Sequence, residues 1–130
     1  MIRGTNAQFK FNMPYKFSEL LVAEITFWQD GHNGEVGRPL PIIKVLGQCS
    51  EGKDPYELVT TLNAEETLRF TDELKGKVQL RAKTLEAHSF ASKETRFTVY
   101  PIYDDSVIED YIEPTPEYNG YVILDAGEVK

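Results

Sequence analysis

The residue types most suited to catalysis or metal binding are few in this chain: two histidines, His32 and His88, and one cysteine, Cys49. A catalytic histidine or cysteine needs a base and an orienting group close in space, and a zinc site needs several ligands. Both histidines fall in predicted loops without a partner at ligand spacing, and Cys49 lies between Gln48 and Ser50. We interpret the histidines as solvated and the cysteine as structural, and we expect no enzymatic activity, no metal and no cofactor.

Paired carboxylates are a second possible source of chemistry, because they can perform acid–base catalysis or bind calcium. Residues 104–105 and 109–110 are acidic pairs that flank the apolar Val107-Ile108, without the glycine of an EF-hand loop. We interpret them as part of a solvated or partner-facing acidic segment.

Composition and charge narrow the class of protein. The chain has 130 residues, of which 41% are hydrophobic and 27% charged, as in a soluble globular domain. No apolar run approaches the roughly 18 residues that cross a bilayer, so we expect no membrane partner. Residues 104–130 hold eight of the 21 acidic residues and one of the 14 basic ones, which accounts for the whole net charge of −7. The body, residues 1–103, is therefore neutral, and we expect no nucleic-acid partner, which would require a basic surplus.

Alternation of polar and apolar residues predicts about six strands. In residues 77–85, the predicted buried face is Val78, Leu80, Ala82 and Thr84, and the solvent face is Lys77, Gln79, Arg81 and Lys83. The other strands are predicted at residues 8–13, 21–28, 41–46, 56–62 and 95–103. Glycines and prolines predict a loop over residues 30–41, and residues 47–55 and 86–92 are predicted turns.

One short helix is predicted after the strand at 56–62. Asn63 is a suitable N-cap, and Glu66 stands where it would complete a capping box. We expect the helix to end near residues 74–76. The predicted fold is a mostly β, immunoglobulin-like sandwich with this helix in a crossover and a C-terminal extension.

The extension, residues 104–130, has the features of a partner-binding arm. Pro114-Thr115-Pro116 favours an extended segment, and the apolar residues 121–124 have strong β propensity. Residues 121–124 would either fold back as the last strand of the same sandwich or add a strand to the sheet of a neighbouring subunit, and we favour the neighbour. The predicted anchor consists of Tyr111, Tyr118, Tyr121, Val122, Ile123 and Leu124.

Trp28 is a second candidate for partner binding. Alternation places it on the strand face opposite Ile25 and Phe27. Two interpretations stay open: exposure to a partner, or burial in the other half of a two-sided core. Under an alternative function, a glycan- or host-surface-binding module, Trp28, His32 and Asn33 would form the site.

Several segments together carry a resemblance to a known family. They are Ile2-Arg3-Gly4-Thr5, Phe9-Lys10-Phe11 with Met13-Pro14, residues 62–70 (LNAEETLRF), residues 78–82 (VQLRA) and Ala91-Ser92-Lys93. In these segments the chain resembles a family of short proteins encoded by tailed phages and prophages of gut bacteria. It departs from the family pattern at residues 5–8, in a longer loop over residues 30–41, and in the acidic extension.

The resemblance implies a small β-rich, virion-associated protein of the head–tail, tail or capsid region. We therefore expect a non-enzymatic structural component of a phage particle. It would be made in the cytoplasm of the bacterial host, and its partners would be other virion proteins and copies of itself.

Overall fold

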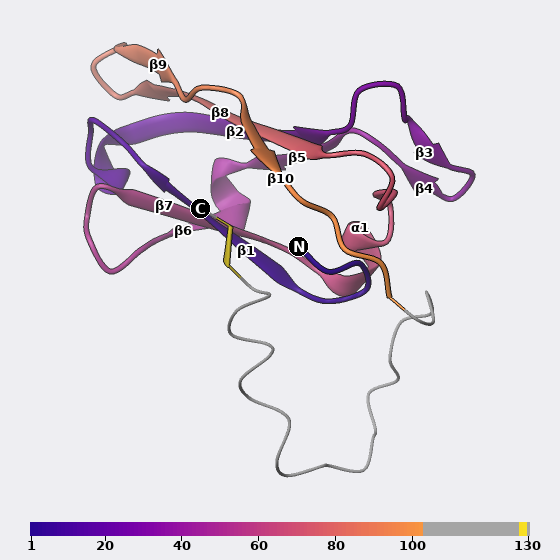
Figure 1. Cartoon of the computed structure of the whole chain (residues 1–130). Helices are drawn as coiled ribbons and strands as arrows, with labels where there is room; N and C mark the ends of the chain where they lie inside the picture. The colour runs from indigo at the N-terminus through magenta and orange to yellow at the C-terminus, as the bar shows by residue number, and fades with distance from the viewer. Residues whose placement is uncertain (103–127, 130) are drawn as a thin grey trace, which may run out of the picture.

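The alternating segments of the sequence form strands that assemble into two facing β-sheets (Figure 1). The computed structural model describes residues 1–102 and 128–129. The first sheet has the order β11-β1-β7-β6, with β1 (Ala7–Asn12), β6 (Cys49–Glu51), β7 (Glu57–Leu62) and β11 (Glu128–Val129). The second sheet has the order β10-β8-β2-β5, with β9 also beside β8. Its strands are β2 (Leu20–Trp28), β5 (Ile42–Val45), β8 (Gly76–Thr84), β9 (Ser89–Ala91) and β10 (Thr95–Phe97).

Short helical segments join some of these strands. The 3-10 helices η1 (Phe17–Glu19) and η2 (Leu46–Gln48) precede β2 and β6. The helix α1 (Ala64–Thr67) lies between β7 and β8, which belong to different sheets. A mostly β fold with antiparallel sheets is thus confirmed, and so is the position of the helix in a crossover.

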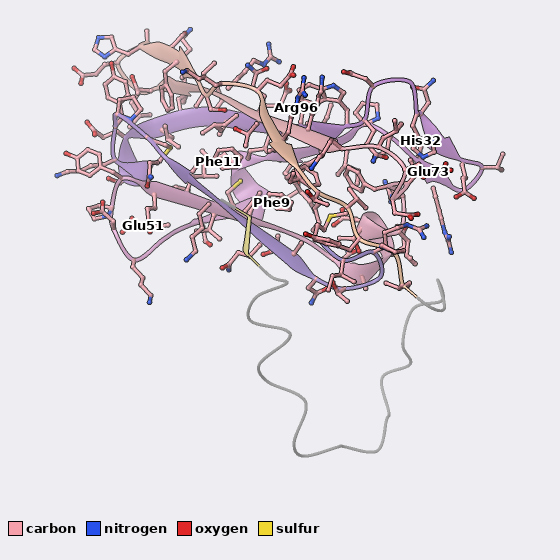
Figure 2. The ribbon with its side chains drawn as sticks, in the orientation of Figure 1. Phe9, Phe11, His32, Glu51, Glu73 and Arg96 are labelled. Carbon is pink, nitrogen blue, oxygen red and sulfur yellow. The ribbon has the colours of Figure 1, made fainter. Side chains whose placement is uncertain are left out.

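The core lies between the two sheets. The predicted inward faces of β2 and β8 are confirmed, since the buried residues there include Ala23, Ile25, Phe27, Val78, Leu80, Ala82 and Thr84. Phe9 of β1 lies at the centre, with its ring centroid 4.9 Å from that of Phe27 and 5.1 Å from that of Phe97 (Figure 2). Because Phe27 and Phe97 belong to the second sheet, Phe9 joins the two sheets.

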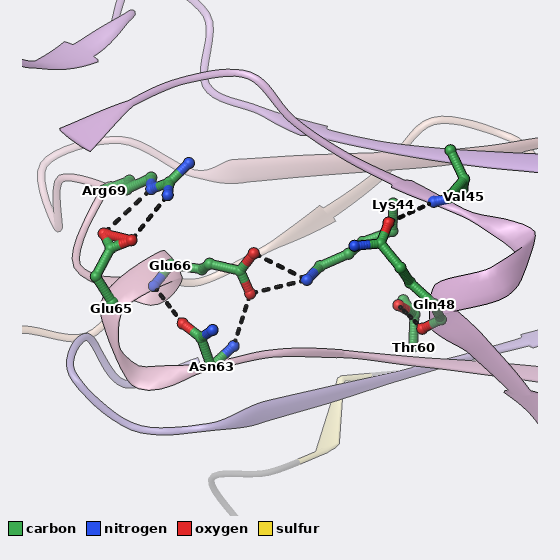
Figure 3. Close-up of polar contacts among 8 residues, drawn as sticks. All are labelled: Lys44, Val45, Gln48, Thr60, Asn63, Glu65, Glu66 and Arg69. Atoms are coloured by element: carbon green, nitrogen blue, oxygen red, sulfur yellow. Dashed lines mark hydrogen bonds and ion pairs between the residues drawn. The ribbon is translucent and has the colours of Figure 1, made fainter. Parts of the chain in front are cut away.

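The helix α1 begins where the sequence predicts. The Asn63 side chain accepts a hydrogen bond from the backbone N–H of Glu66 at 2.8 Å, and the Glu66 carboxylate accepts one from the backbone N–H of Asn63 at 2.9 Å (Figure 3). The Glu66 carboxylate also binds Nζ of Lys44, with both oxygens within 2.9 Å. Lys44 is on β5 and is buried, so the capping box ties the helix to the second sheet.

The predicted helix end at residues 74–76 is wrong, because α1 ends at Thr67. A longer helix would need the carbonyls of residues 68 and 70 as acceptors for amides four residues on. Arg3 takes these carbonyls instead: its Nε donates to Phe70 at 2.6 Å and its Nη2 donates to Leu68 at 3.1 Å. The N-terminal segment therefore replaces the continuation of the helix.

Gln29 holds the segment that follows in the same way. Its Nε2 donates to the carbonyls of Thr71 and Leu74 at 2.8 and 2.9 Å, and its Oε1 accepts from the N–H of Thr71 at 2.9 Å. Gln29 is only 3% exposed. Its buried amide therefore links the residue that follows β2 to residues 71–74, with all of its polar atoms in hydrogen bonds.

Thr67 joins the N-terminal segment to α1. Its hydroxyl accepts from the N–H of Gly4 at 2.9 Å and can donate to the carbonyl of Thr5 at 2.9 Å or of Ala64 at 3.0 Å. Gly4 has a φ of +79°, and a Cβ there would lie 2.6 Å from Cδ1 of Ile102. The backbone conformation therefore favours glycine at this position, and any other residue would also have to displace the end of the Ile102 side chain.

We expect Thr67→Val to destabilise the fold by about 1–3 kcal/mol. Valine keeps the shape of this fully buried side chain but leaves the Gly4 amide and the Thr5 carbonyl without their partner. Urea unfolding followed by fluorescence would measure the loss. The matched control is Thr71→Val, whose hydroxyl makes only solvent-exposed hydrogen bonds, both with Glu73, and which should change stability by less than about 0.5 kcal/mol. Equal stabilities of Thr67→Val and the wild type would contradict this role.

Three strand features lie in stretches predicted as loop or turn. A short hairpin, β3 (Gly34–Glu35) with β4 (Arg38–Pro39), forms within residues 30–41, and β6 and β9 form within 47–55 and 86–92. β6 and β9 are edge strands whose side chains are mostly exposed, so the sequence lacks the two-residue period that marks a buried face. In the described part of the predicted strand 95–103, β10 is the only strand formed, and Tyr100 adds an isolated parallel bridge with Ile2.

Of the predicted extension, only Glu128–Val129 is described, and its backbone pairs in parallel with Gln8 and Phe9 of the same chain. The predicted anchor lies outside the described residues: Tyr111, Tyr118, Tyr121, Val122, Ile123 and Leu124. Both acidic pairs also lie outside them. The two interpretations of residues 121–124 therefore stay predictions.

Candidate functional site

The outer face of the five-stranded sheet carries the side chains that strand alternation turns away from the core. On this face Trp28, Thr26 and Glu24 of β2 lie opposite Lys77, Gln79 and Arg81 of β8. Ile43 and Val45 of β5 extend the face on the far side of β2, and each is 49% exposed. The face contains two depressions: one with several polar residues in its lining, here named the tryptophan hollow, and one that is mostly apolar, here named the aliphatic groove.

The tryptophan hollow has a volume of about 460 Å³ and is lined by Thr26, Trp28, Gln29, His32, Asn33, Pro41, Gln79 and Arg81. This volume falls within the roughly 300–1,000 Å³ of small-molecule sites. The structure brings together Trp28, His32 and Asn33, the residues predicted for a glycan site. His32 lies at the end of the molecule that carries the β3–β4 hairpin (Figure 2).

Trp28 is half-buried on this face and is held by a hydrogen bond. Its Nε1 donates to Oδ1 of Asp30 at 3.1 Å, and Asp30 is also paired with Lys77, which reaches Glu94 at 3.1 Å. Hydrogen bonds from Lys77 and Trp28 lower the pKa of Asp30 below its ordinary 3.8. The hydrogen bonds that Lys77 donates to Asp30 and Glu94 raise the pKa of Lys77. Asp30 is therefore ionised near neutral pH and available to orient the indole.

Several polar side chains around the hollow differ in their availability. All polar atoms of the Gln29 amide are used in holding residues 71–74. Nε2 of Gln79 donates to the carbonyl of Ser92 at 3.0 Å. Within the described residues, no hydrogen bond engages the side chain of His32 or of Asn33. These two side chains are thus the groups best placed to bind a ligand.

The aliphatic groove has a volume of about 850 Å³. Its most exposed apolar side chains are Leu21, Val22 and Val45, which are 51%, 52% and 49% exposed. The other lining residues include Leu46, Ser89, Phe90 and Ala91. A mostly apolar depression of this kind is a common feature of protein interaction sites.

The groove lies beside an open edge of β2. The strand β5 pairs with β2 only from Glu24 to Phe27, because the chain turns into η2 after Val45. Within the described part of the chain, residues 20–23 therefore have no strand neighbour on that side, and the element that follows β5 and contacts β2 is the 3-10 helix η2. An open edge flanked by aliphatic side chains can accept an additional strand.

An ion pair between Glu24 and Arg81 separates the two depressions, and Arg81 lines both of them. The two side chains are 40% and 65% exposed, so solvent screens the pair and its contribution to stability is small. Its effect on the site is to offset the charge of the guanidinium group.

Sequence reasoning missed the aliphatic groove. The signal was the run Leu20-Leu21-Val22-Ala23, in which strict alternation must leave apolar side chains on the outer face. A register shift between Leu20 and Val22 breaks the alternation further, and as a result both Leu21 and Val22 are exposed.

Cys49 and His88 line neither depression, and each makes a contact within the body. The Cys49 thiol donates to the carbonyl of Val45 at 3.3 Å and is half-buried against the core, and this burial raises its pKa. The His88 ring stacks on Tyr15 with centroids 5.6 Å apart.

No three His, Cys, Asp or Glu side chains of residues 1–102 are grouped so that they could hold a metal ion. Within the same part of the chain, no helix has the length and apolar character needed to span a membrane. No protein-family model and no curated protein matches the chain.

Proposed function

We propose that the protein is a non-enzymatic structural component of a bacteriophage particle that assembles by protein–protein contacts. The observation that carries the proposal is the aliphatic groove beside the open edge of β2. Leu21, Val22 and Val45 each expose about half of their surface there, and burying this surface against a partner is favourable.

The arm supplies a segment with suitable chemistry for such a contact. Residues 121–124 are apolar and favour β structure, and main-chain hydrogen bonds to an open edge would add to the apolar contact. In this proposal the partners are copies of the protein and other virion proteins, and the protein works within the virion.

The assignment to a phage particle rests on the sequence resemblance. Two of the segments that carry it, residues 2–5 and 62–70, contact each other through Arg3 and Thr67. These segments therefore act as one structural unit, as expected of motifs that maintain a fold. We also propose that the sandwich is immunoglobulin-like. The two facing antiparallel sheets and the helix in their crossover support this.

The double variant Val22→Lys/Val45→Lys tests the groove. Two charges in an apolar contact area should abolish self-association, because each lysine would have to be desolvated without a partner. Size-exclusion chromatography with light scattering would show the monomer mass for this variant and a larger mass for the wild type.

The control for this experiment is Val36→Lys, a fully exposed residue between β3 and β4 that lines neither depression. Its mass should equal that of the wild type. If the double variant also keeps the wild-type mass, the aliphatic groove is not the assembly surface.

A glycan- or host-surface-binding module is the second candidate, and a different observation favours it. The tryptophan hollow gathers Trp28, His32 and Asn33 in one depression on an otherwise sheet-like surface. On this proposal the protein would attach the particle to a saccharide instead of, or in addition to, joining virion proteins.

A further inference from the structure

The indole of Trp28 forms one wall of the tryptophan hollow and is held there by a hydrogen bond. The indole Nε1 is already bonded to Asp30, and Asp30 is fixed by Lys77 on the neighbouring strand. The group left to a ligand is therefore the apolar ring surface and not its N–H. A fixed aromatic surface suits the apolar C–H face of a sugar ring, because little side-chain freedom is lost on binding.

The groups around the indole match the hydroxyls of a sugar. The Asn33 amide offers both a donor and an acceptor, and the His32 imidazole adds a further polar group. Neither side chain has a hydrogen-bond partner among the described residues. Thr26 contributes a hydroxyl. The Oε1 of Gln79 is available as an acceptor for a ligand, because only its Nε2 is bonded to Ser92.

The charges at the hollow are balanced by neighbouring side chains. Arg81 is paired with Glu24, and Lys77, which lies across from Trp28, is paired with both Asp30 and Glu94. An anionic sugar would have to compete with these carboxylates for the cations, whereas a neutral sugar would not.

We infer that the tryptophan hollow is a subsite for one neutral pyranose ring, which stacks on Trp28 and hydrogen-bonds to Asn33 and His32. This inference rests on the second proposed function, the glycan-binding module. It adds the class of sugar and the residues that hold it.

The test is a titration of the full chain with methyl glycosides of glucose, galactose, mannose and N-acetylglucosamine, with methyl sialoside as the anionic probe. Trp28 is the only tryptophan, so its fluorescence reports directly on the hollow. We expect a saturable change with at least one neutral glycoside and none with the sialoside.

Variants are compared by saturation-transfer NMR, which does not need the indole. Trp28→Ala and Asn33→Ala should each weaken binding at least tenfold, and Asn33→Ala keeps the inference testable if removal of the indole unfolds the protein, because Asn33 is exposed. Tyr56→Ala, an exposed aromatic residue outside the hollow, should bind like the wild type.

A parallel glycan array distinguishes failure of the subsite from failure of the function. Array binding that survives both Trp28→Ala and Asn33→Ala would keep the glycan-binding function and overturn the subsite. Binding of the sialoside alone would overturn the neutral-sugar assignment. Absence of binding both on the array and in the titration would overturn the subsite and the glycan-binding function together.

Discussion

Phe9→Ala should destabilise the protein by about 3–5 kcal/mol, which is a large effect for a single substitution. Phe9 is 2% exposed and makes edge-to-face contacts with Phe27 and Phe97 across the two sheets. Alanine would leave a cavity at the centre of the core and remove both ring contacts. Since small domains are stable by only about 5–15 kcal/mol, the variant would be close to unfolding.

Urea unfolding monitored by Trp28 fluorescence measures this effect, with all proteins at one concentration because association also stabilises. Tyr56→Ala is the control: it removes an aromatic ring that is 42% exposed and should cost less than about 0.5 kcal/mol. A Phe9→Ala midpoint equal to that of Tyr56→Ala would show that the sheets are not held together at this contact.

Deletion of residues 104–130 should leave a folded β protein and abolish assembly. The buried hydrophobic core of the described structure comes entirely from residues 1–99, and the only described strand in the deleted part is β11. Circular dichroism should therefore retain its β spectrum, while light scattering should give the monomer mass. If the shortened chain unfolds, the arm belongs to the core of the body and does not serve assembly.

The deletion also changes the charge of the protein, which complicates its interpretation. It removes the whole net charge of −7 and leaves a neutral body that is prone to precipitate. The matched variant replaces Tyr121, Val122, Ile123 and Leu124 by serine. It keeps the length and the charge of the arm and should also lose assembly. Assembly that persists in this variant would show that the acidic part, and not the apolar segment, makes the contact.

The elements predicted well from sequence are those determined by local pattern. The period of two in residues 77–85 predicts both faces of β8, and the Asn63 to Glu66 spacing predicts the start of α1. The end of α1 could not be predicted, because Arg3 and Gln29 replace its continuation from distant positions in the sequence. Such tertiary contacts outweigh helix propensity, which amounts to less than about 1 kcal/mol per residue for most residues.

The candidate site was predicted only in part, because local pattern places some of its residues and tertiary contacts place the others. Alternation alone places Trp28 outward, and the proximity of His32 and Asn33 in sequence suggests a common site. Gln79 and Arg81 join them only through the register of β2 with β8. The aliphatic groove depends on where β5 stops pairing with β2, and no local pattern in the sequence gives that position.

Sedimentation velocity of the unmodified full chain over a wide range of concentrations tests most directly whether the protein acts by assembly. The proposal predicts species heavier than the 14.8 kDa monomer that increase with concentration and are absent for Val22→Lys/Val45→Lys. A single 14.8 kDa species at every concentration would contradict self-assembly through this surface.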